Sequence, residues 1–319
     1  MTVPPPDLGR APIPEPGPAP GLAGANGHPY GGALVFHSDI PVPSDLVWIL
    51  VAGSDARPGQ DIRHQRSDSL HLLAVNPRTM QGTVVGFPRD SWVEIPGHGT
   101  GKINTALAIG GPQLMAETVR HLTGLPVDYY VLTGFAGLPD IVDELGGVDV
   151  YVDRRMNDSA SGARFEPGWH HFNGGETLAF SRDRHDVPNG DFTRSENQGK
   201  VILAALAKMR AEVSDEGGLS SWINVLVRHV DLDMGMGDLM RLGALARRLA
   251  PESLNNIVLP GKVGTAGGQS VVFLGDAAAQ VFLDLRPDAV LGNAGPEVTT
   301  TTSTTEEPTT TTSTTALFP

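Results

Sequence analysis

After a proline-rich start, the chain contains three short apolar runs, at residues 46–53, 69–75 and 83–87. The first ends at a glycine, and each of the other two stops at or close to a proline. Apolar runs of this length, bounded by turn residues, are typical of buried strands. Because no helical pattern separates the three runs, we expect them to form an antiparallel meander.

Helical and strand patterns alternate along the rest of the chain. The apolar spacing predicts helices over 111–124, 135–145, 192–213, 218–229, 238–249 and 276–285. Strands are predicted over 127–132, 148–152, 257–259 and 271–273, and residues 153–172, which show no periodicity, are predicted to form a long loop. This order predicts an α/β fold with a layered α-β-α architecture around a central mixed β-sheet.

Both ends of the chain lack such a pattern. Residues 1–44 hold eleven of the 26 prolines, and residues 299–315 consist of twelve Thr, two Ser, two Glu and one Pro. Segments of this composition bury too little apolar surface to offset the entropy of ordering. We therefore predict a folded domain over 45–290, between a disordered Pro/Gly-rich segment at 1–44 and a disordered Thr-rich tail at 291–319.

Charge and composition narrow the classes of function. The 23 basic and 36 acidic residues give a formal net charge of −13, which argues against a nucleic-acid partner. The absence of cysteine excludes disulfides, thiolate zinc sites and cysteine nucleophiles. No apolar run approaches the roughly 20 residues of a membrane-spanning helix. The N-terminus also lacks the basic-then-apolar pattern of a signal peptide.

Charged residues gather at one edge of the expected meander. The first strand ends there, the second begins there, and the third ends there again. Asp55 follows the first strand, Arg66 and Asp68 precede or open the second, and Arg89 follows the third. Arg57 and Arg63 are expected at the same edge. These side chains should therefore converge from separate parts of the sequence.

The helix predicted from residue 192 changes character along its inward face. Val201, Ala205 and Met209 form an apolar stripe, and the same spacing leads back to Gln198, Arg194 and Asp191. Buried charges require a partner or a ligand, and helix N-termini favour anions. Two interpretations stay open: a phosphate-type ligand at this end, or an internal ion pair between Arg194 and Asp191.

Arginine dominates the basic residues, with 19 Arg and four Lys. Arg182 and Arg184 are two residues apart, so their side chains would lie on one side if this segment is extended. The guanidinium group grips phosphate oxygens in pairs. Many arginines beside the carboxylates of Asp55 and Asp68 suit a doubly charged phosphate group together with a hard divalent cation such as Mg²⁺.

The same residues carry a family resemblance. The matching stretches are 51–57, 66–69, 87–91, 102–104, 141–148, 182–184 and 190–194, the last leading to Gln198. In their number and order these motifs resemble the LytR-CpsA-Psr (LCP) family of cell-envelope phosphotransferases. The resemblance covers about 46–212 well and is weaker to about 285.

The resemblance implies a fold, a reaction and partners. An LCP-like catalytic domain would bind a polyprenyl-pyrophosphate-linked glycan, with the lipid in an apolar tunnel and the pyrophosphate at an arginine-rich mouth. It would transfer a glycan phosphate to a hydroxyl of peptidoglycan or a related wall acceptor, with pyrophosphate cleavage as a possible side activity. The family implies an extracytoplasmic place in the cell envelope. In this chain, proximity to the membrane would come from the lipid substrate, because the usual N-terminal anchor is not seen.

The resemblance also assigns roles to single residues. Asp55 and Asp68 would hold Mg²⁺ (or Mn²⁺), and Arg89, Asp191 and Arg194 would form the catalytic group. Phosphate binding falls to Arg66, Arg89, Lys102, Arg182, Arg184, Arg194 and Gln198. Asn197 stands where the family often has arginine, which implies one missing phosphate contact. Candidates for the tunnel wall are Leu114, Val119, Leu122, Leu138, Ile141, Ile202 and Leu206.

Two other functions fit the same residues. One is a non-catalytic polyprenyl-phosphate binder or sensor that has kept the pocket. The other is an unrelated Mg²⁺-dependent hydrolase acting on soluble phosphates. Turnover of a lipid pyrophosphate and its loss in variants of the acidic residues separate these from the transferase.

Overall fold

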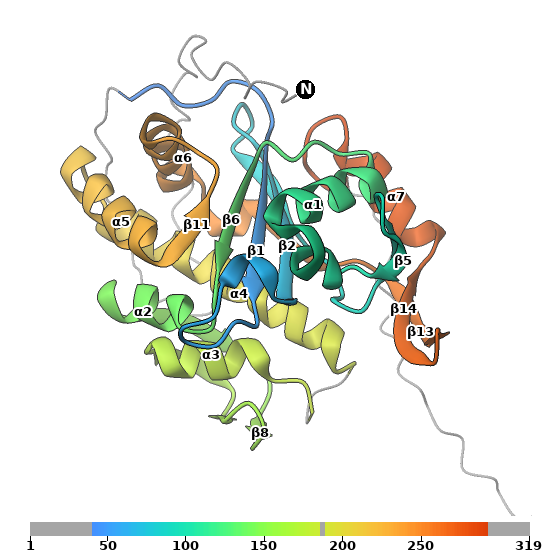
Figure 1. Ribbon diagram of the computed structural model, residues 1–319. Coiled ribbons are helices and arrows are strands. Elements are labelled where there is room, and N and C mark those ends of the chain that lie inside the picture. Colours follow the sequence, from blue (N-terminus) through green and yellow to red (C-terminus); the bar gives the residue numbers. More distant parts are fainter. Residues whose placement is uncertain (1–39, 186–188, 293–319) are drawn as a thin grey trace, which may run out of the picture.

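The computed structural model describes residues 40–185 and 189–292, and its centre is a six-stranded sheet (Figure 1). The strands follow the order β11-β6-β1-β2-β3-β12. They comprise β1 (Val47–Ser54), β2 (Ser67–Asn76), β3 (Gln81–Gly86), β6 (Tyr129–Thr133), β11 (Val230–Leu232) and β12 (Leu254–Val258). β1, β2 and β3 form the predicted antiparallel meander, and β6 and β12 add parallel strands outside it. The predicted mixed sheet is confirmed.

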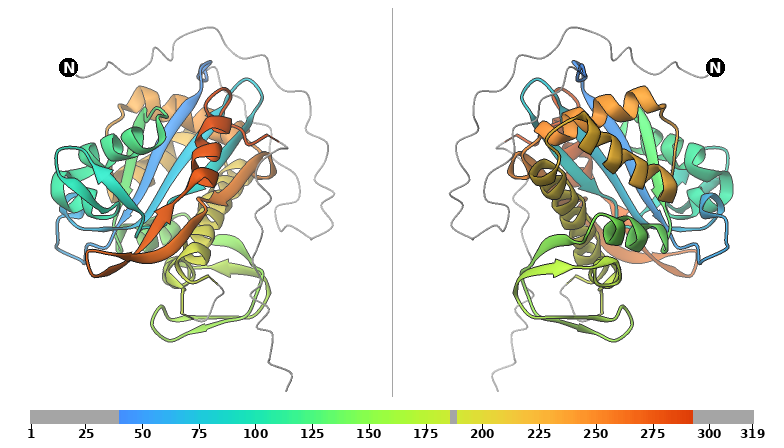
Figure 2. Two further views of the ribbon diagram at one scale, coloured as in Figure 1. Left: turned by 90° about the vertical axis from the view of Figure 1, so that its right-hand side faces the viewer. Right: turned by 90° about the vertical axis from the view of Figure 1, so that its left-hand side faces the viewer.

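Helices cover both faces of this sheet (Figures 1 and 2). One face carries α1 (Thr105–Thr123) and α7 (Asp276–Leu285), and the other carries α4 (Asp191–Glu212), α5 (Glu216–His229) and α6 (Met236–Arg248). Side chains along β1 alternate between the two cores: Leu50 packs with Met115 of α1, whereas Val47 packs in the cluster that includes Trp222 of α5. This alternation follows from the two-residue period of a strand. The layered α-β-α architecture is confirmed.

Residues 153–172 do not form the predicted loop. They contain β8 (Met156–Asp158), β9 (Ala163–Phe165) and β10 (Gly168–Phe172), and β10 pairs with β7 (Val148–Val152). These ribbons lie beyond one end of the main sheet (Figure 2). Their inward side chains form a third core cluster against α4. The prediction was wrong because three-residue strands are too short to show an alternating pattern.

Helix α3 (Gly174–Arg182) follows directly and was also not predicted. Its N-terminus is a capping box: Asn173 Oδ1 accepts from the backbone N–H of Glu176, and the Glu176 carboxylate accepts from that of Asn173. The Asn-x-x-Glu spacing in the sequence is a recognised start signal for a helix. α3 brings Arg182 to the end of the sheet where β1 ends.

The remaining elements are short; α2 and β14 correspond to predicted segments, whereas the others were not predicted. They are α2 (Gly137–Glu144), the hairpins β4 (Trp92–Ile95) with β5 (Gly99–Lys102) and β13 (Gly261–Ala266) with β14 (Gln269–Leu274), and the 3₁₀ turns η1 (Ile62–His64) and η2 (Pro251–Ser253). α1 begins six residues before the predicted start at 111, because its axis is kinked at Gly110 and Gly111. The conformation of Gly111, with φ of 69°, favours glycine.

The packed domain extends beyond both predicted boundaries. Val42 is buried and Ile40 packs beside it, so the fold includes residues before 45. At the other end Leu291 packs on the core, and the N–H of Gly292 donates to Asp284. The rest of the predicted disordered segments, 1–39 and 293–319, lies outside the described residues. Among the helices described, none has the length and apolar character needed to cross a membrane.

Candidate phosphate-binding site

The site lies at the edge of the sheet where the meander was predicted to gather charge. Gly53 of β1 pairs with Ser69 of β2, and His71 of β2 pairs with Gly86 of β3. The end of β1, the start of β2 and the loop after β3 therefore share one edge. The N-terminus of α4 and the C-terminus of α3 reach the same edge, so five segments contribute side chains to one site.

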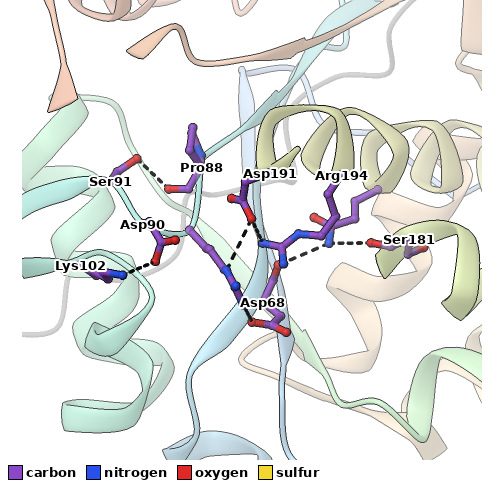
Figure 3. A network of polar contacts seen from close by, with 10 residues as sticks. Asp68, Pro88, Asp90, Ser91, Lys102, Ser181, Asp191 and Arg194 are labelled. Carbon is purple, nitrogen blue, oxygen red and sulfur yellow. Dashed lines mark hydrogen bonds and ion pairs between the residues drawn. The ribbon is translucent and has the colours of Figure 1, made fainter. Parts of the chain in front are cut away.

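An ion-pair network joins three of these segments (Figure 3). Arg89 Nη1 lies 2.5 Å from Asp68 Oδ1, and Arg89 Nε lies 3.5 Å from Asp191 Oδ1. Asp191 Oδ1 in turn lies 2.7 Å from Nη2 of Arg194. Asp191 is thus held between two guanidinium groups, which fixes the relative position of Arg89 and Arg194.

Burial disfavours the positive charge of Arg194. Its side chain is only 5% exposed. Burial lowers the pKa of Arg194, Asp191 opposes this shift, and the nearby cations Arg89 and Arg184 add to it. Burial also acts against the cation of Arg89, but Asp68, Asp191 and Asp90 outweigh it and raise the pKa of Arg89. An anion that approached Arg194 would offset its desolvation.

A cavity opens beside this network and has two kinds of wall. Its polar wall contains Asp68, Arg182, Arg194 and Gln198. Its apolar wall includes Val51, Phe135, Leu138, Leu178, Val201 and Ile202. The guanidinium carbon of Arg182 lies 5.0 Å from the centre of the Phe135 ring, where the two walls meet. This arrangement suits a ligand with an anionic head and an apolar tail.

Two further predicted phosphate ligands, Gln198 and Lys102, also have protein partners. Gln198 Nε2 donates to the backbone oxygens of Ser181, at 3.1 Å, and Asp68, at 3.3 Å. Gln198 therefore ties α3 to the start of β2 and positions residues around the cavity. Lys102 Nζ lies 2.9 Å from Asp90 Oδ1, to one side of the network (Figure 3).

Asp55 lies close to Asp68. Burial raises the pKa of Asp55, and the charge of Asp68 raises it further. In the described part of the chain no group of three or more His, Asp or Glu side chains could hold a metal ion. Mg²⁺ is nevertheless often bound by only one or two protein carboxylates, while phosphate and water supply its other ligands. The repulsion between Asp55 and Asp68 is what a divalent cation would relieve, so these residues fit such an ion.

Comparison with known proteins decides the family. The model of the LytR_cpsA_psr family matches residues 37–284. The chain belongs to the LytR-CpsA-Psr family. A stretch of 166 residues is 40% identical to the polyisoprenyl-teichoic acid–peptidoglycan teichoic acid transferase TagU of Bacillus mycoides (strain KBAB4). That stretch covers 52% of this chain and 53% of TagU, so the match spans about half of the relative.

Solved structures of similar proteins cover more of the fold. B. subtilis TagV is 25% identical, with a TM-score of 0.68 over 79% of this chain and 100% of that one. A structure of "TagT bound to LI-WTA" is 27% identical, with a TM-score of 0.63 over 77% of this chain and 91% of that one. The resemblance drawn from the sequence motifs is confirmed at the level of family and fold.

Not every arginine expected at the edge joins this LCP site. The backbone N–H of Asp55 donates to the backbone oxygen of Arg66, so the two residues are adjacent. The positive charge of Arg66 acts to lower the pKa of Asp55, against the effect of burial. The positive charge of Arg184 helps to lower the pKa of Arg194, so Arg184 belongs to the same group of cations. Arg63, in contrast, pairs with Asp231 at 3.2 Å and lies outside the network. The expectation for Arg63 was wrong because the 55–66 loop turns toward β11.

The structure places Asn197 and some of the predicted tunnel residues. Asn197 is fully buried in α4 and is not among the residues that line the cavity. Of the predicted tunnel residues, Leu138 and Ile202 do line it, whereas Leu114 and Val119 belong to the core on the α1 side of the sheet. The missing phosphate contact at position 197 stays a prediction.

The sequence did not reveal Phe135 and Leu178 as cavity residues. Phe135 follows β6, which lies beside β1 and ends at the same edge. A parallel pairing of these two strands, once assumed, would have placed Phe135 near Asp55. Leu178 lies on α3, and its position becomes visible only when the capping box at Asn173 is recognised.

Helix α4 reaches the site because it packs very closely on β3. A Cβ atom at Gly86 would lie 2.4 Å from Oγ of Ser195 and 3.2 Å from Nε2 of His71. We expect Gly86→Ala to push α4 from the sheet and to lower the free energy of unfolding by about 1–3 kcal/mol. Urea unfolding measures this change. Gly237→Ala, where a Cβ meets nothing within 4 Å, is the matched control and should not be destabilised. Equal stability of the two variants would contradict the close packing.

Proposed function

We propose that this LCP protein transfers a glycan phosphate from a polyprenyl-pyrophosphate-linked precursor to a hydroxyl of a peptidoglycan-type acceptor. The observation that carries the proposal is the junction of the partly buried Arg89–Asp191–Arg194 network with an apolar cavity. Such a site matches a pyrophosphate joined to a hydrocarbon chain. The name of TagU, as a polyisoprenyl-teichoic acid–peptidoglycan transferase, supports the same pairing of donor and acceptor.

Each side chain has a task in this proposal. Arg89, Arg194, Arg182, Arg184 and Arg66 neutralise the pyrophosphate oxygens, on which negative charge grows as the bond to the leaving group breaks. Asp191 orients Arg89 and Arg194 through its two ion pairs. Catalysis of phosphoryl transfer rests mainly on such positioning and charge stabilisation. Polyprenyl phosphate leaves, and its chain stays along the apolar wall.

The apolar wall gives the reaction its selectivity. Leu138 and Ile202 line the cavity from α2 and α4. A soluble nucleotide has no hydrocarbon chain to bury there, whereas each buried CH₂ of a prenyl chain contributes about 0.8 kcal/mol. A donor that resides in the membrane and an acceptor in the wall set the reaction at the extracytoplasmic side of the cell envelope.

Asp55 and Asp68 would hold a divalent cation, Mg²⁺ or Mn²⁺. When bound, that ion neutralises charge on the pyrophosphate. We expect Asp55→Asn to raise the Mg²⁺ concentration for half-maximal activity about 10- to 100-fold, in the range seen when ligand support is lost. Since the pKa of Asp55 is raised, acidification should weaken Mg²⁺ binding at a higher pH than for an ordinary aspartate.

A Mg²⁺ titration of transfer at several pH values measures both effects. Asp45→Asn serves as the control, because Asp45 is half exposed and pairs only weakly with Arg78, at 3.8 Å. An unchanged Mg²⁺ requirement in Asp55→Asn would remove Asp55 from the proposed ion site.

A direct assay tests the proposed reaction. The full chain is incubated with Mg²⁺, a polyprenyl-pyrophosphate disaccharide labelled in the sugar, and a soluble peptidoglycan oligomer. We expect label in the oligomer and release of polyprenyl phosphate. Without acceptor, slow release of polyprenyl phosphate would represent a pyrophosphatase side activity. Tight binding of the donor with no release would instead favour a lipid binder, and faster turnover of nucleotides would favour a soluble-phosphate hydrolase.

A further inference from the structure

Phe135 lines the cavity at the boundary between its apolar and polar walls. Arg182 lines the cavity beside it, and the guanidinium carbon of Arg182 lies over the Phe135 ring, 5.0 Å from the ring centre. An aromatic ring attracts a cation through its electron-rich face. This contact therefore joins a residue of the apolar wall to a cation of the phosphate site.

Close packing fixes the turn that carries Phe135. A Cβ atom at the preceding residue, Gly134, would lie 3.0 Å from Cγ2 of Ile62. A Cβ atom at Gly137 would lie 2.6 Å from the backbone oxygen of His229. The backbone on either side of Phe135 thus has little room to move, which gives the ring a defined place at the cavity.

The backbone around Arg182 is fixed as well, although Arg182 itself is exposed. The backbone oxygen of Ser181 accepts a hydrogen bond from Nε2 of Gln198 at 3.1 Å, and Asp183 is fully buried. In the part of the chain that the structure describes, no carboxylate forms an ion pair with Arg182. The ring of Phe135 is therefore the contact that locates its guanidinium group.

This attachment differs from that of Arg89 and Arg194, which share the carboxylate of Asp191. A carboxylate neutralises the cation that it holds and occupies its N–H donors, whereas a phenyl ring carries no net charge and no oxygen acceptor. Arg182 thus keeps its charge and its donors for a phosphate group. Because the ring already restricts the side chain, less conformational entropy is lost when a ligand binds.

We propose that Phe135 is a positioning residue for the transfer and acts through Arg182. Its ring holds the guanidinium group at the polar wall, where the pyrophosphate would bind. The same ring lines the cavity, so the hydrocarbon chain next to the pyrophosphate would contact it. Phe135 thereby favours a ligand that carries both an anionic head and an apolar tail. This inference rests on the proposed transferase function, in which Arg182 binds the pyrophosphate.

A double-mutant cycle in the transfer assay tests this role. Phe135→Leu keeps the wall apolar but removes the ring, and we expect kcat to fall about 3- to 30-fold, as for the loss of a cation–π contact. Phe135→Tyr keeps a ring and should recover most of the loss. In an Arg182→Gln background, Phe135→Leu should change kcat less than about twofold, because no cation remains to be held. Any change in donor KM through the apolar wall should persist in both backgrounds.

A second measurement uses inorganic pyrophosphate, which has no hydrocarbon tail and requires no turnover. Its Kd for the full chain with Mg²⁺ is measured by isothermal titration calorimetry. We expect Phe135→Leu to raise this Kd about 3- to 30-fold and Phe135→Tyr to restore it. In the Arg182→Gln background, Phe135→Leu should leave the Kd unchanged. A purely structural role of Phe135 would not show this dependence on Arg182.

Tyr151→Leu controls for the loss of an aromatic side chain. Tyr151 of β7 is 48% exposed, its ring contacts that of Trp169, and neither residue lines the cavity. The variant should keep the wild-type kcat and pyrophosphate Kd. Thermal unfolding checks the fold of every variant, and Phe135→Met, which also keeps the site apolar, replaces Phe135→Leu if that chain does not fold.

The outcomes separate the inference from the function on which it rests. If Phe135→Leu keeps both kcat and the pyrophosphate Kd within about twofold, Phe135 does not position Arg182. Equal losses in the wild-type and Arg182→Gln backgrounds would overturn the proposal too, since Phe135 would then act without Arg182. If the wild-type chain binds pyrophosphate but transfers nothing, the proposed function fails, and the calorimetric cycle still decides the role of Phe135. A wild-type chain that does not bind pyrophosphate would contradict both.

Discussion

Replacing Arg89 with alanine is expected to lower the rate of transfer by about 10²–10³, the loss seen when one oxyanion-stabilising donor is removed. Arg89 contacts Asp68 at 2.5 Å and Asp191 at 3.5 Å, so it connects the proposed ion site to the α4 end of the network. Its removal would take a cation from the pyrophosphate and leave two partly buried carboxylates with one partner fewer. Both consequences reduce the stabilisation of the transition state.

Arg89→Lys distinguishes charge from geometry. A lysine keeps the charge but cannot contact Asp68 and Asp191 with two nitrogen atoms of one planar group, so we expect it to recover only part of the activity. Arg155→Ala is the control, because Arg155 forms an ion pair with Glu166 in which both side chains are 72% exposed. Initial rates at saturating donor give the comparison. Wild-type turnover by Arg89→Ala would contradict the assigned site.

Acidification is expected to destabilise the fold through His71. This residue is fully buried in β2, and its Nε2 donates to the backbone oxygen of Ser195 in α4 at 3.0 Å. Burial lowers the pKa of His71 to about 4, from the ordinary 6.5. Above pH 6.5 the ring is neutral in both the folded and unfolded chains. As pH falls from 6.5 toward 4, only the unfolded chain gains the proton, and about 3 kcal/mol of stability is lost.

Urea unfolding between pH 7.5 and pH 4 measures this loss. His71→Gln should be less stable at pH 7.5 but should show a much flatter dependence on pH over the same range. Asp153 and Asp158, whose pKa values are lowered to about 2, lose their stabilising charges only at lower pH, so they act outside this window. If the free energy of unfolding of His71→Gln fell as steeply with pH as that of the wild-type chain, the loss would come from groups other than His71. Because His71 supports α4, activity should decline along with stability.

The sequence was sufficient to predict the frame of the site. Three apolar runs without intervening helices imply a meander, and a meander brings Asp55, Asp68 and Arg89 to one edge by strand direction alone. Helical spacing added Asp191 and Arg194, since their place on the inward face of α4 follows from the apolar stripe at Val201. Of the two interpretations of Arg194, the structure contains the ion pair with Asp191. The phosphate-type ligand stays a prediction, and Arg194 lines the cavity where such a ligand would lie.

The rest depended on contacts that local patterns do not encode. The short strands β8 and β9 are recognisable only through their packing on α4, so the contact between His185 and Asp158 was not visible in the sequence. The bonding of Gln198 to two backbone oxygens is equally non-local. The cavity itself depends on α3, whose start is marked by a single capping box. In each case the missing information was the distance between segments far apart in the chain.

A crystal structure of the protein with a bound polyprenyl pyrophosphate would locate the ligand directly. We expect the two phosphates to contact the guanidinium groups of Arg89 and Arg194. We also expect the hydrocarbon chain to lie along Leu138 and Ile202. Phosphates bound elsewhere, or a chain that lies on the outer surface while this cavity is closed, would contradict the proposed site.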